Sequence, residues 1–267
     1  MTITALTTYR SLELPNMLWL EAETADGVVG LGETFYAAEA VEAYIHANLA
    51  PIVLGMSAVD IEAVYYRTRP YVGFVAASTE LRARSALDIA LWDALGKVTG
   101  QPISVLLGGR IRSQIPVYNT CAGNQYVRGT KLGTTENFGI ASLGTDQNYE
   151  DLDRFLNDPV GLAGSLLDMG IDSMKIWPFD FAAEATQGQF ISPAELNKAL
   201  APFEAIKKEY GDRMQISAEL HGMWNLSESL IICQALDEIG MRWIEDPVFL
   251  TNPTGIQELK LAVPSRI

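Results

Sequence analysis

The sequence predicts an α+β domain followed by an α/β domain whose strands and helices alternate as in a (β/α) barrel. In residues 1–35 the apolar side chains alternate as in β-strands, and the segments that follow have helical spacing. From residue 115 onward, short apolar runs alternate with helical segments, which is typical of parallel βα units. Charged side chains end several of these runs, at the positions where a barrel has its active site. We therefore expect domains at residues 1–114 and 115–267.

The amino-acid composition indicates an ordinary globular protein and argues against several classes of partner. The 267 residues are 48% hydrophobic and 19% charged, as in an ordinary globular protein, and the formal net charge is −14. This charge disfavours nucleic acid and anionic membranes as partners. The two cysteines, Cys121 and Cys233, are too few for a disulfide framework, and we expect reduced thiols. We find neither a signal peptide pattern nor an apolar run of membrane-spanning length, so we expect a cytoplasmic protein.

The first domain begins with a hairpin. Two alternating runs, Leu18–Thr24 and Val28–Glu33, flank an Asp-Gly pair that suits a tight turn. Gly100 and Pro102 then mark the end of the longest helical pattern. Helical spacing predicts three helices in this domain, at residues 37–49, 60–67 and 79–98.

The second domain contains four predicted strands, each followed by a helix or a long loop. The strands are at residues 115–121, 172–177, 214–219 and 242–247, and the helices at 159–170, 193–210, 227–239 and about 253–262. Ser192 and Glu195 form a capping-box pattern, and Pro202 should bend or split the helix that they open. The polar segment 122–148 is long enough to be a functional loop. Glycine-rich nucleotide-binding patterns are missing after the strands, which favours a barrel over a nucleotide-binding sheet.

Candidate functional residues stand at the strand ends. Glu219 and His221 are two residues apart and share a face of their strand, and Glu245 lies 26 positions after Glu219, about one βα unit later. Two carboxylates at neighbouring strand ends suit a hard cation such as Mg²⁺. Lys175 stands at the end of the preceding strand and is expected to point into the same pocket.

Two further residues are candidates for substrate binding. Trp177 has two interpretations of equal weight, a core residue or a wall of the substrate pocket. Asn225 either lines the pocket or begins the following helix, and the sequence does not choose between them. Cys121 ends a predicted strand, but no activating base stands beside it, so we do not expect a nucleophile there.

Three stretches together resemble the mandelate racemase/muconate lactonising branch of the enolase superfamily. They are the helix Ala83–Asp93 with Gly100-Gln101-Pro102 and Leu106–Gly109 after it, the hairpin Asp26–Glu33, and the strand ends at Glu219 and Trp243–Pro247. The resemblance implies an α+β capping domain before a modified barrel. It also implies a Mg²⁺-dependent reaction that starts by removing the proton α to a carboxylate, with a Lys or His base.

By this resemblance, Glu219 and Glu245 are the first two metal ligands, although Asp is the commoner residue at the first position. The third ligand would come from the fifth strand, and strands six to eight would supply an Asp–His pair and another carboxylate. The chain ends at Ile267, so we expect a truncated member with an incomplete barrel of about four to five strands. A half-barrel exposes a strand edge, and we expect a homo-oligomer.

The resemblance also bears on the type of reaction. Many racemases and cycloisomerases of this branch carry Lys-x-Lys where this chain has Lys175-Ile176-Trp177, so the inner lysine is replaced. His221 resembles the histidine with which acid-sugar dehydratases protonate the departing hydroxyl. We therefore expect a sugar acid as small-molecule substrate, dehydration as the reaction, and Lys175 as partner of the substrate carboxylate. The alternatives are a racemase, epimerase or cycloisomerase, and a catalytically inactive fragment.

Overall fold

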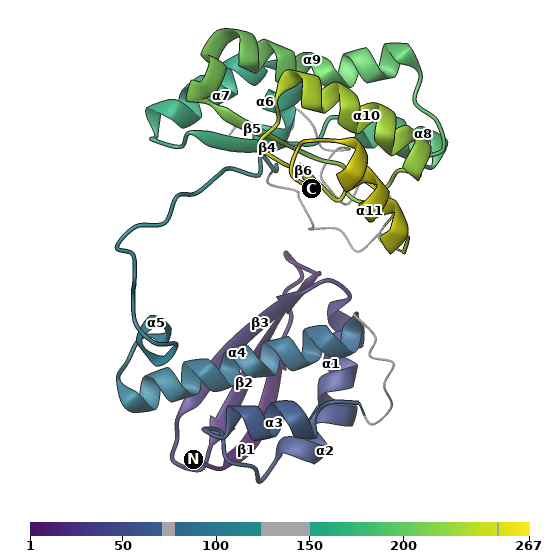
Figure 1. Cartoon of the computed structure of the whole chain (residues 1–267). Coiled ribbons are helices and arrows are strands. Elements are labelled where there is room, and N and C mark those ends of the chain that lie inside the picture. The colour runs from purple at the N-terminus through teal and green to yellow at the C-terminus, as the bar shows by residue number, and fades with distance from the viewer. Residues whose placement is uncertain (71–77, 124–149, 250) are drawn as a thin grey trace. The chain divides into compact units, whose positions relative to one another are not determined.

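The chain forms two compact units, one from Met1 to Gln114 and the other beginning at Ile115. The structure is a computed structural model that describes residues 1–70, 78–123, 150–249 and 251–267 (Figure 1). The polar segment predicted as a functional loop lies almost entirely outside the described residues. Each unit has its own cluster of buried apolar side chains.

The first unit is a three-stranded antiparallel sheet covered by helices. Its strands β1 (Ile3–Tyr9), β2 (Met17–Thr24) and β3 (Val29–Phe35) pair in the order β1-β2-β3, and the turn at Gly27 confirms the predicted hairpin. The helices are α1 (Ala38–Tyr44), α2 (Ala50–Val53), α3 (Ile61–Arg67), α4 (Thr79–Thr99) and α5 (Ile103–Leu106). The predicted helix at 37–49 is α-helical only to Tyr44 and continues as a π-helical turn over Ile45–Leu49.

Two glycines of β3 allow α4 to lie directly on the sheet. A Cβ added to Gly30 would overlap the carbonyl oxygen of Ala90, and one added to Gly32 would overlap that of Ala86. Alanines on the facing side of α4 are fully buried, so the helix and the strand approach almost backbone to backbone. The small residues of this helix and strand thus specify how they pack.

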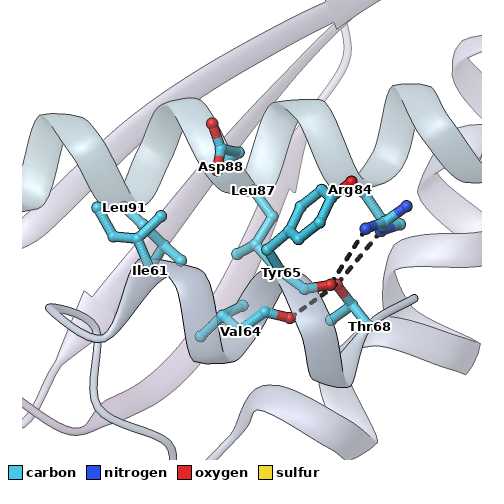
Figure 2. Close-up of a pocket in the computed structure, with 8 residues that line it drawn as sticks. All are labelled: Ile61, Val64, Tyr65, Thr68, Arg84, Leu87, Asp88 and Leu91. Carbon is cyan, nitrogen blue, oxygen red and sulfur yellow. Dashed lines mark hydrogen bonds between the residues drawn. The ribbon is translucent and has the colours of Figure 1, made fainter.

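A small pocket between α3 and α4 is organised by a buried arginine (Figure 2). Arg84 donates from Nη2 to the carbonyl of Tyr65 (3.1 Å) and from Nε to Thr68 Oγ1 (3.3 Å), and its guanidinium lies over the Tyr65 ring. Burial, followed by the charge of Glu62, raises the pKa of neighbouring Asp88. The cavity volume is about 10 Å³, room for about one water. These contacts join the two helices, and the pocket is too small for a substrate.

The second unit is built on a parallel sheet with strands in the order β4-β5-β6, as expected for an incomplete barrel of βα units. The strands are β4 (Ser173–Ile176), β5 (Gln215–Glu219) and β6 (Ile244–Glu245). The helices are α6 (Asp151–Asn157), α7 (Pro159–Asp168), α8 (Asp180–Thr186), α9 (Pro193–Tyr210), α10 (Leu226–Ile239) and α11 (Pro253–Ala262). The predicted fold class, an α+β unit before a partial parallel barrel, is confirmed.

Two predictions about elements need correction. Of the run 115–121, only Asn119 pairs with the sheet, through a parallel bridge to Met174, and Ile115 and Val117 are exposed, so the run lacks the packing that would make it a full strand. Pro202 was expected to bend or split its helix, and the split is wrong: α9 runs without a break from Pro193 to Tyr210. Pro202 is buried beside Phe203, and packing of this face against the core offsets the lost hydrogen bond.

The parallel strands separate apolar from polar side chains. Met174, Ile176 and Ile216 point to one face and join the apolar core with the helices. The alternate positions on the other face carry polar side chains that are also buried: Ser173, Lys175, Ser217 and Glu219. This buried polar face leads to the C-terminal ends of the strands. None of the described helices is both long enough and apolar enough to cross a membrane.

Candidate active site

The strand ends of the second unit bring three charged side chains together. Glu219 at the end of β5 lies directly beside Glu245 at the end of β6, and Lys175 reaches them from β4. Because the strands are parallel, all three stand at the same edge of the sheet. This is the arrangement on which the sequence-based hypothesis of a metal site depends.

Lys175 bridges the two glutamates. Its Nζ is 2.9 Å from Glu219 Oε2 and 2.7 Å from Glu245 Oε1, and the lysine is only 6% exposed. Burial alone would lower the pKa of Lys175, but the hydrogen bonds and charges of the two carboxylates outweigh it and raise the pKa to about 12. The lysine is therefore an ammonium group shared by two carboxylates.

The two carboxylates differ in their surroundings. Burial raises the pKa of Glu219, against the opposing charges of His221 and Lys175. Partial burial also acts on Glu245, but hydrogen bonds from Lys175 and from Trp243 Nε1 (3.0 Å) prevail and lower its pKa. Glu245 is consequently the carboxylate that holds its charge more firmly.

His221 lies two residues beyond Glu219 and is held from several sides. Its backbone N–H donates to Glu219 Oε1 (2.9 Å), and its Nδ1 is 2.8 Å from Oδ2 of Asp180. The Trp177 ring meets the imidazole edge-on, with centroids 5.4 Å apart. His221 has a φ of 51°, in the left-handed region. The turn after β5 thus fixes the imidazole close to the carboxylate of Glu219.

Asp180 is a functional candidate that the sequence analysis missed. It is the first residue of α8 and is completely buried. Burial raises the pKa of Asp180, and the hydrogen bond from His221 opposes this rise. Burial would lower the pKa of His221, but the hydrogen bond and charge of Asp180 raise it. The position of Asp180 in the sequence could have indicated it: Asp180 lies a few residues after Lys175, just beyond the C-terminal end of β4.

The two residues predicted to bind substrate have structural contacts. Trp177 is 2% exposed and also packs against Phe155, at 5.5 Å between centroids. Asn225 caps α10: its Oδ1 accepts from the backbone N–H of Glu228 (3.0 Å) and its Nδ2 donates to the carbonyl of Gln189 (3.3 Å). Asn225 thus begins the following helix, one of its two interpretations. Substrate contact by either residue stays a prediction.

Cys121 lies near the same edge of the sheet but has the properties of a structural thiol. The residue is fully buried, and burial raises the pKa of its thiol well above the ordinary range. A protonated thiol is a poor nucleophile. The geometry therefore supports no nucleophilic role for this cysteine.

The donor set suits a divalent cation in part. Glu219 and Glu245 already hold one cationic group between them, the ammonium of Lys175, so their oxygens converge on a single point. Carboxylate oxygens are the ligands that Mg²⁺ prefers. In the part of the chain that the structure describes, no cluster of three or more His, Cys, Asp or Glu could hold a metal. The described residues thus fit two ligands of a metal ion.

Two family models match the chain. Residues 4–108 match the N-terminal domain of mandelate racemase/muconate lactonizing enzyme, and residues 160–267 match the enolase C-terminal domain-like family. A crystal structure of an enolase of the mandelate racemase subgroup from Agrobacterium tumefaciens has 40% identity and a TM-score of 0.83, over 99% of this chain and 62% of the other. Muconate lactonizing enzyme from Pseudomonas putida has the same fold, with a TM-score of 0.72 at 23% identity, over 99% of this chain and 64% of the other.

Curated relatives include sugar-acid dehydratases and a cycloisomerase. D-mannonate dehydratase of Novosphingobium aromaticivorans is 28% identical over 236 residues, which are 86% of this chain and 55% of the relative. Muconate cycloisomerase 1 of Pseudomonas putida is 24% identical over 266 residues, 96% of this chain and 58% of the relative. D-galactonate dehydratase of Pectobacterium atrosepticum is 26% identical, over 93% of this chain and 56% of the relative. The chain therefore spans little more than half the length of these relatives.

Proposed function

Because the chain belongs to the mandelate racemase/muconate lactonizing enzyme branch of the enolase superfamily, we propose that it supplies part of the active site of a sugar-acid dehydratase. The reaction removes the proton α to a carboxylate and expels the β-hydroxyl as water. The observation that carries this proposal is the cluster of Lys175, Glu219 and Glu245 at neighbouring strand ends, with His221 two residues further on. The names of several relatives support the choice of sugar acids.

Each residue of the cluster has a role in the proposal. Glu219 and Glu245 would hold Mg²⁺, which when bound stabilises the negative charge that develops on the substrate carboxylate. Lys175 would pair with that carboxylate, since it supplies an ammonium group at the same edge of the sheet. We assign no described residue to the α-proton, because Lys175 is held by two carboxylates and Trp177 has no titratable group.

His221 would be the general acid. Elimination of water requires a proton on the departing hydroxyl oxygen, which an imidazolium can donate. The hydrogen bond and charge of Asp180 outweigh burial and raise the pKa of His221, which favours the protonated ring. The α C–H bond breaks and its proton passes to a base that lies outside the described residues. The β C–O bond breaks, a C=C bond forms, and the hydroxyl leaves as water with the proton from His221. Asp180 and Trp177 hold the ring while this happens.

The test combines Mg²⁺ binding with product analysis on the purified protein. Titration calorimetry measures Mg²⁺ affinity, and NMR in D₂O follows a panel of sugar acids for loss of water. We expect His221→Asn to lower the rate of dehydration by about 10²- to 10⁴-fold while Mg²⁺ affinity is retained. The matched control is His46→Asn, which changes an exposed histidine of the first unit and should leave both quantities unchanged. Dehydration that persists in His221→Asn would remove the assignment.

An isomerase is the second candidate, and the alignment with muconate cycloisomerase 1 over 96% of this chain favours it. A racemase, epimerase or cycloisomerase would exchange the α-proton of its substrate for deuterium without releasing water. The same NMR experiment therefore separates the two reactions. A purified chain of 29.2 kDa that neither binds Mg²⁺ nor acts on any acid would support the third expectation, an inactive fragment.

A further inference from the structure

Asp180 and His221 come from two different βα connections and meet in a buried contact. Asp180 begins α8, which follows β4, and His221 lies in the turn after β5. The contact joins Asp180 Oδ2 to His221 Nδ1 at 2.8 Å, and Asp180 has no exposed surface. Water therefore does not compete for this bond, and the pair is not an incidental surface ion pair.

We propose that Asp180 is a positioning residue that holds His221 in the tautomer protonated at Nδ1, so that Nε2 is the nitrogen that exchanges a proton with substrate. The inference rests on the general-acid role proposed for His221. The carboxylate itself touches neither substrate nor metal in this proposal. It acts through the orientation and the tautomer of the imidazole.

The chemistry of the contact argues for this tautomer. An ionised carboxylate only accepts hydrogen bonds, so Nδ1 must be the donor at this distance. A buried carboxylate is costly unless it is paired, and within the described residues Asp180 Oδ1 makes no hydrogen bond. The bond from His221 is therefore the main compensation for burying Asp180. An aspartate holds the histidine of the Ser-His-Asp triad in one tautomer in the same way.

The ring is also restrained in ways that leave rotation little freedom. Trp177 packs edge-on against the imidazole, and the backbone N–H of His221 is fixed by Glu219 Oε1. The hydrogen bond to Asp180 then selects which of the two ring nitrogens faces α8. Of these contacts, the hydrogen bond to Asp180 is the one made by a ring nitrogen, so it is the one that bears on which nitrogen carries the proton.

The experiment is ¹⁵N NMR of the full chain labelled at histidine. The sequence has only two histidines, so the spectrum contains two imidazoles, and His46→Asn assigns them. The spectrum is recorded at a pH high enough for both rings to be neutral, where the tautomer can be assigned. We expect His221 to be protonated at Nδ1 in the unchanged protein. A neutral His221 protonated at Nε2 would overturn the proposal, and this measurement needs no variant that has to fold.

Variants add a second readout. In Asp180→Asn we expect His221 to lose its Nδ1-protonated form and show the opposite tautomer, while the His46 signals stay in place. The matched control is Glu184→Gln, which removes an exposed carboxylate from the same helix and should leave the tautomer unchanged. An Asp180→Asn protein that retains Nδ1 protonation would contradict the role of the carboxylate. The tautomer is measured without substrate, so this experiment does not depend on catalysis. A failure of the dehydratase proposal would appear only in the assay of water loss from sugar acids.

Discussion

At the scale of single residues, the candidate site is defined by a lysine that neutralises two carboxylates at once. Lys175 and Glu219 are both nearly buried, and Glu245 is partly exposed. Removing one partner of a buried ion pair is costly because the other charge stays buried without compensation. Lys175 is therefore a structural counterion of the two carboxylates as well as a proposed partner for substrate.

We expect Lys175→Met to lower the free energy of unfolding by about 3 kcal/mol near neutral pH, because Glu219 loses its buried counterion. Urea denaturation followed by circular dichroism measures this. The control Lys198→Met removes an exposed lysine of α9 and should cost no more than about 0.5 kcal/mol. Equal losses in the two variants would show that the bridge contributes nothing specific.

The raised pKa of Lys175 predicts how this difference depends on pH. A group whose pKa is higher in the folded protein stabilises it below the ordinary pKa and loses that contribution as pH rises through the folded value. For Lys175 the contribution is complete below pH 10.5 and is lost by about pH 12, a change of about 2 kcal/mol. The difference between wild type and Lys175→Met should shrink over this range, and a constant difference would contradict the prediction.

The sequence predicted the residues of this cluster better than their partners. The spacing of Glu219 and Glu245 follows from the length of one βα unit, which the sequence displays directly. His221 was expected on the same strand face as Glu219, but β5 ends at Glu219 and His221 lies in the turn after it, with a φ of 51°. The contact between Asp180 and His221 joins residues 41 positions apart and depends on where α8 begins. No periodicity reports such a contact. The bridge by Lys175 was missed for the same reason, although its pocket-facing side chain was expected.

At the scale of elements, the start of α9 is the clearest local signal. Ser192 Oγ accepts from the backbone N–H of Glu195 (3.2 Å), and the Glu195 carboxylate accepts from the backbone N–H of Ser192 (3.0 Å). The Ser192 hydroxyl also donates to Glu195 Oε2 (2.7 Å), and this hydrogen bond, followed by that from the backbone N–H of Ser192, lowers the pKa of Glu195. The capping box was predicted from sequence and is confirmed, because all its atoms lie within four residues.

We expect Ser192→Ala to destabilise the second unit by about 1 kcal/mol at neutral pH, because the helix loses its cap. A carboxyl whose folded pKa is depressed stabilises above its unfolded pKa, here 4.5, and loses this contribution as pH falls through the folded value. The cost of Ser192→Ala should therefore be smaller in acid. Thermal melts at both pH values test this, with Ser227→Ala, an exposed serine of α10, as the neutral control. A cost that grows in acid would be inconsistent with the capping box.

The elements that were predicted wrongly depend on tertiary packing. The run 115–121 has the composition of a strand, but pairing needs a neighbour, and only Asn119 finds one. Pro202 has the local chemistry to break a helix, but its buried position beside Phe203 holds α9 together. Local propensity decides neither case, since the energy of packing exceeds that of the local preference.

At the scale of the whole chain, the two units have separate apolar cores. Each unit buries its own strands against its own helices. We therefore expect damage to one core to stay within its unit. The domain boundary expected from sequence rested on the change from helical spacing to βα alternation, which is a property of long segments.

We expect Gly32→Ala to unfold the first unit selectively, because the new Cβ would overlap the carbonyl oxygen of Ala86 and force α4 away from β3. Hydrogen exchange should accelerate for amides of β3 and α4 and stay unchanged for β4, β5 and β6. The control Glu33→Ala alters an exposed neighbour on the same strand and should leave exchange unchanged in both units. Faster exchange in β5 of Gly32→Ala would show that the units unfold together.

The backbone at the strand ends limits which residues can stand there. Cys121, His221 and Asp246 follow the paired segments and have φ values of 52°, 51° and 43°. Histidine, asparagine and aspartate accept this left-handed conformation more readily than most residues, and β-branched residues do not. Position 221 can therefore exchange an imidazole for an amide or a carboxylate without rebuilding the turn. During evolution, the turn after β5 can therefore change its chemistry by a single substitution at position 221, while Glu219 stays unchanged.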